Sequence, residues 1–147
     1  MAFHFTLETI LRYRRSLEDH EQLRLKAMLL RRAAILQQQE QLRKARSELQ
    51  ADLQGVLSQV GLTAAELQFC LIRSRDIQLS EEQLKLPLGE LQSEIVAQTA
   101  RYQVERQRRE VLESLRDVQL RKYETERTRR EQSMLDELHL LRRHRRL

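Results

Sequence analysis

One apolar column constrains the fold of this chain more than any other feature. Its members recur at intervals of seven residues, and they are Met28, Ile35, Leu42, Leu49 and Val56. Between residues 6 and 60 the only Gly or Pro is Gly55. This spacing predicts a helix over about residues 6–60, which at 1.5 Å per residue would be roughly 80 Å long. So long a helix needs a second element to cover its apolar stripe.

The neighbouring positions of this repeat are much more polar. We assign them to Arg31, Gln38, Ala45 and Asp52, so that the heptad is only half-filled. Leucines also lie off the column, at Leu29, Leu30 and Leu36. Two interpretations stay open: these leucines broaden the helix's own stripe, or they form a docking surface for another protein.

The composition agrees with a helical chain. Of 147 residues, 33% are charged and only 4% aromatic, with three Gly, one Pro and no Trp. Leu, Arg, Glu, Gln and Ala favour helices, whereas the residues that favour strands are scarce. This profile is typical of long helices or a coiled coil, and the length predicts a single domain over 1–147.

A break in the pattern follows the first helix. Gly61 has the position of a helix C-cap, and Thr63 and Glu66 form a capping box that would start a new helix. Leu62 and Leu67 stand at the positions of a hydrophobic staple around that start. We therefore expect the first helix to end near residue 60.

A second set of start signals lies further on. Ser80 and Gln83 form another potential capping box, and Pro87 suits the first turn of a helix. These signals predict a tip with a short helix over about 61–86 and a second long helix over about 87–145. The expected seam of that helix comprises Leu88, Leu91, Ile95, Tyr102, Leu112 and Leu115 and resumes at Met134, Leu138 and Leu141.

Two long striped helices joined by a short capped segment should fold back on each other. The predicted fold is therefore all-α, a long antiparallel two-helix coiled-coil hairpin with a short helical segment near the tip. At the open end, Thr6 is the expected N-cap, with Phe5 and Ile10 as its staple. In such a hairpin Phe3 and Phe5 would lie beside Leu138 and Leu141.

No catalytic constellation is visible. The four histidines are scattered, and neither a metal-binding spacing nor a glycine-rich phosphate loop occurs. We expect no enzymatic activity, no cofactor and no metal. Cys70 follows Phe69 in a predicted helix and is expected to be an inert, buried thiol.

The charge pattern is mixed except at the C-terminal end. Net charge is +5, and acids and bases alternate until "LRRHRRL", where Arg142, Arg143, Arg145 and Arg146 have no acid nearby. These arginines are either a solvated helix end, where cations suit the helix dipole, or a contact for an acidic surface. Nucleic acid is not expected as a partner, because acids offset the basic residues elsewhere and no aromatic platform accompanies them.

The same sequence indicates a location. A single cysteine suits a reducing compartment, and the N-terminus lacks the apolar stretch of a signal peptide. Nor does any stretch approach the roughly 18 apolar residues of a transmembrane helix. We expect a cytoplasmic protein that reaches a membrane only through its partners.

The opening "FHFTLETILRYRR" resembles the N-terminus of the bacterial flagellar FliJ family. The matching residues are Phe3, Phe5, Leu7, Glu8, Ile10, Leu11, Tyr13 and Arg14, and the "GLTAAELQF" corner is similar to the middle of family members. The resemblance spans the whole chain in length and layout. Pro87, early in the second helix, departs from it.

This resemblance implies a coiled-coil hairpin similar to the γ-subunit stalk of rotary ATP synthases, working in flagellar type III protein export. Its implied partners are a hexameric export ATPase, whose centre receives the terminal end, a membrane export-gate protein and export chaperones. The implied location is the cytoplasmic face of the inner membrane. The expected partner-binding residues are Phe3, Phe5, Leu7, Ile10, Leu11, Arg142, Arg143, Arg145 and Arg146. A general coiled-coil scaffold and an injectisome stalk protein remain alternatives.

Overall fold

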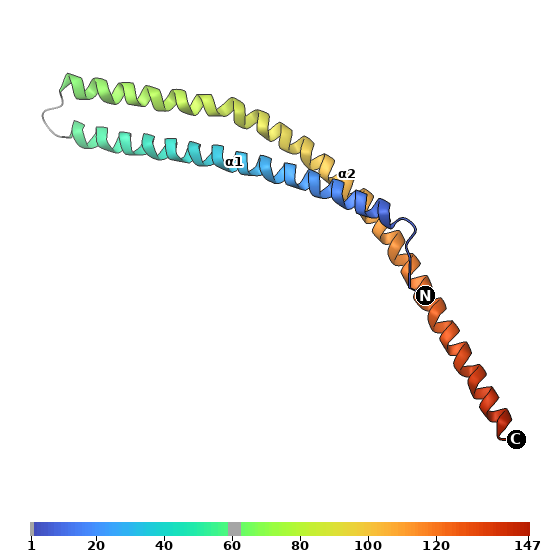
Figure 1. Cartoon of the computed structure of the whole chain (residues 1–147). Coiled ribbons are helices and arrows are strands. Elements are labelled where there is room, and N and C mark those ends of the chain that lie inside the picture. The colour runs from blue at the N-terminus through green and yellow to red at the C-terminus, as the bar shows by residue number, and fades with distance from the viewer. Residues whose placement is uncertain (1, 59–62) are drawn as a thin grey trace. The chain divides into compact units, whose positions relative to one another are not determined.

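The computed structural model describes residues 2–58 and 63–147 and contains two long helices. Helix α1 spans Glu8–Leu57 and helix α2 spans Ala64–Arg145 (Figure 1). No strand occurs in the described ranges. The prediction of an all-α two-helix hairpin is confirmed.

The chain divides into two compact units, and each helix runs through both. The tip unit comprises Glu21–Tyr102, and the terminal unit comprises Met1–His20 with Gln103–Leu147. In the tip unit, the Gln98 amide donates to the carbonyl of Glu21 at 3.1 Å, and Arg46 pairs with Glu81 at 3.2 Å. As the position along α1 advances, the partner's number along α2 falls, so the helices are antiparallel.

The seam of the tip unit confirms the predicted apolar column. All five of its members, from Met28 to Val56, are half-buried on α1. Of the predicted companion positions, Ala45 is half-buried, whereas Arg31, Gln38 and Asp52 were placed one residue too early and are exposed. The half-buried companions are instead Leu25, Arg32, Gln39 and Leu53. A heptad alternates steps of three and four residues, and one column alone does not fix which step comes first.

Helix α2 covers this seam with the same period. Ile77 and Leu91 are 6% and 4% exposed, and Leu84, Leu88 and Ile95 between and after them are half-buried. One residue in this series is polar: Gln98 is 2% exposed, and its amide hydrogen bonds to Glu21 satisfy it. The tip unit is thus held by an apolar seam that ends at a buried amide.

The predicted capping box at the tip is confirmed. The backbone N–H of Glu66 donates to the Thr63 hydroxyl at 3.3 Å, and the Thr63 N–H donates to the Glu66 carboxylate at 3.4 Å. These reciprocal bonds satisfy N–H groups that have no partner within the helix. The predicted roles of Gly61 and Leu62 lie outside the described residues.

The second predicted helix start is wrong. Residues 64–78 do become helical, but α2 continues through Ser80 and Pro87 without interruption, so no separate short helix precedes a start at 87. Proline removes one N–H and crowds the preceding turn, which costs about 3 kcal/mol in a helix interior. Pro87 is exposed, and the half-buried Leu84 and Leu88 beside it keep both sides of the turn packed.

The start of α1 also differs from expectation. The first backbone bonds run from Glu8 N–H to the Phe5 carbonyl at 3.1 Å and from Leu11 N–H to the Leu7 carbonyl at 2.9 Å. The helix therefore begins two residues after the predicted Thr6 cap. Ile10 is 46% exposed and Leu11 0%, so the residue that becomes buried is the one after the predicted staple partner.

Candidate partner-binding surfaces

The N-terminal segment packs within the terminal unit. Phe5 is 3% exposed and Leu11 is fully buried, whereas Phe3 and Leu7 are half-buried and Ile10 is exposed. Of the five predicted contact residues in this segment, Phe3, Leu7 and Ile10 therefore keep accessible surface. Phe5 and Leu11 serve mainly to fix the segment to the rest of its unit.

The aromatic start meets α2 at a different place from the one predicted. The ring of Phe3 lies 5.6 Å from the ring of Tyr123, centroid to centroid and tilted by 50°. Leu138 and Leu141, the expected neighbours, are 53% and 65% exposed. At 1.5 Å per residue, Leu138 lies roughly 22 Å further along α2 than Tyr123. The prediction that both chain ends meet there is therefore wrong.

An ionic seam adds to these apolar contacts in the terminal unit. The Arg109 guanidinium donates to the carboxylate of Glu18, which is 9% exposed, and pairs with Glu113 at 2.6 Å. Arg15 reaches the same Glu113 at 3.1 Å. The helices are thus joined by a chain of four alternating charges. The sequence alone did not reveal it, because acidic and basic residues are interleaved along most of α2 and only the antiparallel register shows which of them meet.

Arg109 stays positively charged within this set of ion-paired side chains. The pKa of its guanidinium is raised above the ordinary value, first by the hydrogen bond to Glu18, with the field of Glu113 adding to it and burial opposing it. A raised folded-state pKa adds stability that is complete below the unfolded value and lost only as pH rises through the folded one. Arg109 therefore contributes equally throughout the neutral range.

Two more ion pairs extend the ionic seam. Arg14 lies 3.6 Å from Glu105, and Arg116 lies 3.4 Å from Glu8. Of the apolar residues that were predicted to form the seam here, Leu112 is half-buried and Leu115 is 40% exposed. The part of α2 from Glu105 to Arg116 therefore binds α1 largely by charge.

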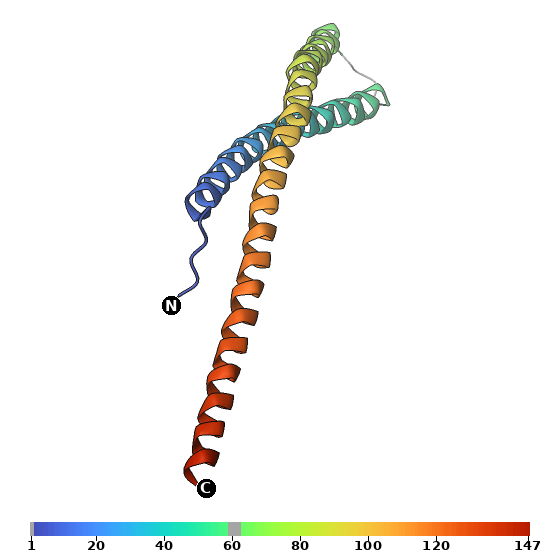
Figure 2. The same ribbon diagram turned by 90° about the vertical axis from the view of Figure 1, so that its right-hand side faces the viewer.

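Beyond Tyr123, α2 continues without any cover from α1. Every residue from 124 to 147 is exposed, and Figure 2 shows this part of α2 as a single helix running past the N-terminal segment. We call residues 124–147 the overhang. Its exposed apolar side chains are Met134, Leu135, Leu138, Leu140, Leu141 and Leu147.

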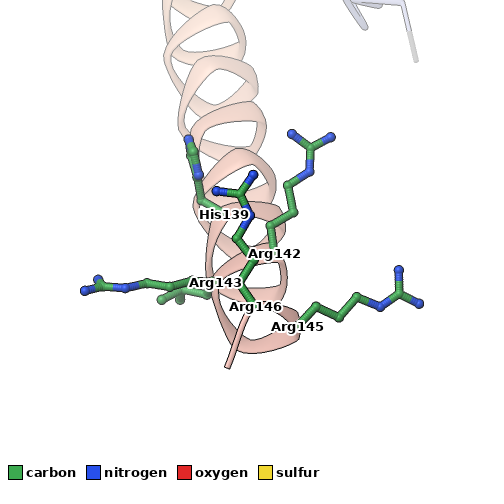
Figure 3. Close-up of a pocket in the computed structure, with 6 residues that line it drawn as sticks. His139, Arg142, Arg143, Arg145 and Arg146 are labelled. Carbon is green, nitrogen blue, oxygen red and sulfur yellow. The ribbon is translucent and has the colours of Figure 1, made fainter.

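Four arginines project from the last turns of the overhang. In Figure 3 Arg143 and Arg145 point to opposite sides of the helix, with Arg142 and Arg146 between them. Together with His139 and Leu140 they frame a hollow that is widely open to solvent. All four predicted arginines are thus presented to the outside.

A groove interrupts the surface of the tip unit where the two helices meet. It has a volume of about 430 Å³ and is lined by both helices, with Leu42 and Leu84 as its largest apolar residues. Ala45 and Ser80 are small, and so leave room between the helices. Glutamines 38, 41 and 83 complete the lining, which contains no charged side chain. Ser80, predicted as a cap, thus lines the groove.

The off-column leucines of α1 are accessible as well. Leu29, Leu30 and Leu36 are 43%, 72% and 41% exposed. Cys70 is half-buried. Among the residues that the structure describes, there is no group of three or more side chains suited to a metal ion. Nor does any helix within these ranges contain an apolar stretch long enough to cross a bilayer.

Comparison with known proteins gives one match. The family model described as flagellar FliJ protein matches residues 3–147. No curated protein matches the chain, and no solved structure does. Because the family model covers essentially the whole chain, this protein belongs to the flagellar FliJ family, whose members are non-enzymatic components of the flagellar protein-export apparatus.

Proposed function

We propose that this protein inserts the overhang of α2 into the centre of the hexameric export ATPase and couples the ATPase to the membrane export gate. The observation that carries the proposal is the exposure of every residue from 124 to 147 on a helix that is paired elsewhere. An apolar face without a partner on an otherwise packed protein is typical of a docking surface.

The overhang has the dimensions and the face of an insertion element. From residue 124 to the end of α2 at Arg145 it rises about 33 Å. Met134, Leu138 and Leu141 follow the spacing i, i+4, i+7, so they share one side of the helix, and each is more than half exposed. A helix of this kind binds by laying that side against an apolar wall.

The N-terminal segment supports this end of the protein. Phe3 rests on Tyr123, one residue before the overhang begins, and Phe5 and Leu11 are buried behind it. We propose that Phe3, Leu7 and Ile10 contact the rim of the ATPase opening with their remaining accessible surface. The proposed binding region therefore combines this segment with the overhang and its arginines.

The groove of the tip unit is the proposed contact for the export gate. It is apolar at Leu42 and Leu84, uncharged at its edges and formed by both helices. Because α1 and α2 each run through both units, a partner held here is joined to the ATPase by continuous helix. Export chaperones are a further proposed partner, for which Leu29, Leu30 and Leu36 offer exposed apolar surface.

The test of ATPase docking changes only the overhang. Replacing Met134, Leu138 and Leu141 by Ser should weaken binding to the purified export ATPase by about tenfold or more, because the apolar contacts are lost. Binding is measured by co-purification and by isothermal titration. The helix content by circular dichroism should change little, since these side chains cover nothing in the free protein.

A matched control removes equal apolar surface elsewhere. Leu86, Val96 and Val111 are 70%, 71% and 68% exposed and lie on α2 outside the overhang. Their triple replacement by Ser should leave ATPase binding unchanged. If the overhang variant binds as tightly as the wild type, docking by the overhang is wrong.

A further inference from the structure

The last four arginines of the chain form a run of cations that contains no acidic side chain. Further back on α2, Arg106, Arg109 and Arg127 each pair with a glutamate four residues away along the same helix. Within the described residues, no ion pair involves Arg142, Arg143, Arg145 or Arg146, and the last acidic side chain before them is Glu137. Four cations are therefore left for a partner to neutralise.

The directions in which the four arginine side chains point indicate the shape of the surface that binds them. Arg143 and Arg145 project to opposite sides of the helix, and Arg142 and Arg146 fill the sector between them (Figure 3). A flat surface would meet only one of these sides. A concave surface that encloses the helix end reaches all four guanidinium groups at once.

The apolar residues of the overhang form a second segment, which precedes the arginines along the helix. Met134, Leu138 and Leu141 lie on the side that Arg145 continues, four residues after Leu141. The overhang thus presents an apolar level over 134–141 and a cationic level over 142–146. An enclosing partner has to match the two levels in this order along the helix.

We propose that the end of α2 is received by a concave protein socket with an apolar wall facing residues 134–141 and a collar of carboxylates around residues 142–146. This inference rests on the proposed function, for it assigns the chemistry of the ATPase opening. Arginine suits such a collar, because its planar guanidinium binds carboxylates through two parallel hydrogen bonds.

Lipid and nucleic acid fit the overhang less well. Glu131, Asp136 and Glu137 lie among its apolar residues, and phosphate groups would repel them. A bilayer surface is also flat on the scale of a helix, so the guanidinium of Arg143 and that of Arg145 could not both lie on it. A protein socket can leave the three acids outside its collar.

The experiment replaces the four arginines by Gln in the full-length chain and measures affinity for the purified export ATPase in increasing salt. For the wild type we expect a dissociation constant that rises about tenfold between roughly 0.05 and 0.3 M NaCl, because salt screens partly exposed charges. For the Gln variant we expect binding at least about tenfold weaker at low salt, with little further dependence on salt.

The matched control carries the same loss of net charge at a distance from the overhang. Arg12, Arg43, Arg106 and Arg108 are 78%, 81%, 55% and 54% exposed at their side chains. Replacing these four by Gln should leave the affinity within about twofold of the wild type, because exposed pairs contribute little. A similar loss in both variants would overturn the socket in favour of a general charge effect.

The remaining outcomes separate this inference from the proposed function. If the wild type does not bind the ATPase, the proposed function fails and the socket with it. If the wild type binds and the overhang Gln variant binds equally well in all salt conditions, only the socket is overturned. Binding to phosphatidylserine vesicles or duplex DNA that disappears in the Gln variant would also overturn it.

Discussion

The tip unit and the terminal unit join the same two helices with the same sequence period but with different chemistry. In the tip unit the facing positions are filled by side chains such as Leu84 and Leu91, and in the terminal unit by Glu18, Arg109 and Glu113. Apolar side chains stabilise the pairing of two helices in any register in which they overlap. A chain of ion pairs stabilises the pairing only in the register in which each charge faces its partner. The tip unit is therefore held mainly by its apolar seam, and the terminal unit by ion pairs together with the buried Phe5 and Leu11.

The largest effect is expected from breaking the apolar side of this comparison. Leu91 is 4% exposed in the tip unit, so Leu91→Ala removes buried methyl groups and leaves a cavity. We expect the free energy of unfolding to fall by about 2–4 kcal/mol. Urea unfolding followed by circular dichroism measures it, with the exposed Val96→Ala as a control that should change stability by less than about 0.5 kcal/mol. Equal effects of the two substitutions would contradict an apolar seam.

A smaller effect is expected on the ionic side. Glu18→Gln removes one carboxylate from the charge chain and leaves Arg109 with Glu113 and the more distant Glu110. We expect a loss of about 1–2 kcal/mol, since a poorly exposed charge loses a charge-assisted hydrogen bond. A double-mutant cycle with Arg109→Gln measures the coupling, and Glu131→Gln, at the exposed pair with Arg127, is the control. Zero coupling between Glu18 and Arg109 would show that the pair is not formed in solution.

The smallest expected effect is a difference between the two units in how their amide hydrogen exchange responds to salt. Raising NaCl from roughly 0.1 to 1 M shortens the screening length from about 10 Å to 3 Å. We expect amide hydrogen exchange over residues 8–20 to accelerate by about threefold, while exchange over residues 28–49 stays constant or slows. The Glu18→Gln variant should lose most of this salt response. A uniform response along both helices would remove the distinction between the seams.

The sequence was sufficient for the helices and for one face of the seam. The column from Met28 to Val56 and the capping box of Thr63 and Glu66 are both found where they were predicted, because period and capping are local properties. The apparent second start at Ser80 was wrong for a related reason. A capping box is only a local preference, and in α2 the tertiary packing of Ile77, Leu84 and Leu88 overrides it.

The candidate surfaces were less predictable, because they depend on register. Phe3 meets Tyr123 instead of Leu138, and nothing local in the N-terminal motif distinguishes these positions on α2. In the terminal unit the register follows from long-range pairs such as Glu18 with Arg109 and Glu8 with Arg116. The same register places Phe3 against Tyr123, the last residue of α2 before the overhang.

The overhang has a thermodynamic consequence for whatever receives it. A single helix of about 22 residues is marginally stable in water, because its nucleation is costly and no tertiary contact supports it. The chain on the C-terminal side of Tyr123 relies on the preceding helix as its nucleus and melts from its free end. A partner that binds the overhang must also order those last turns, and the free-energy cost of this ordering reduces the net affinity. The same contacts are therefore released more readily.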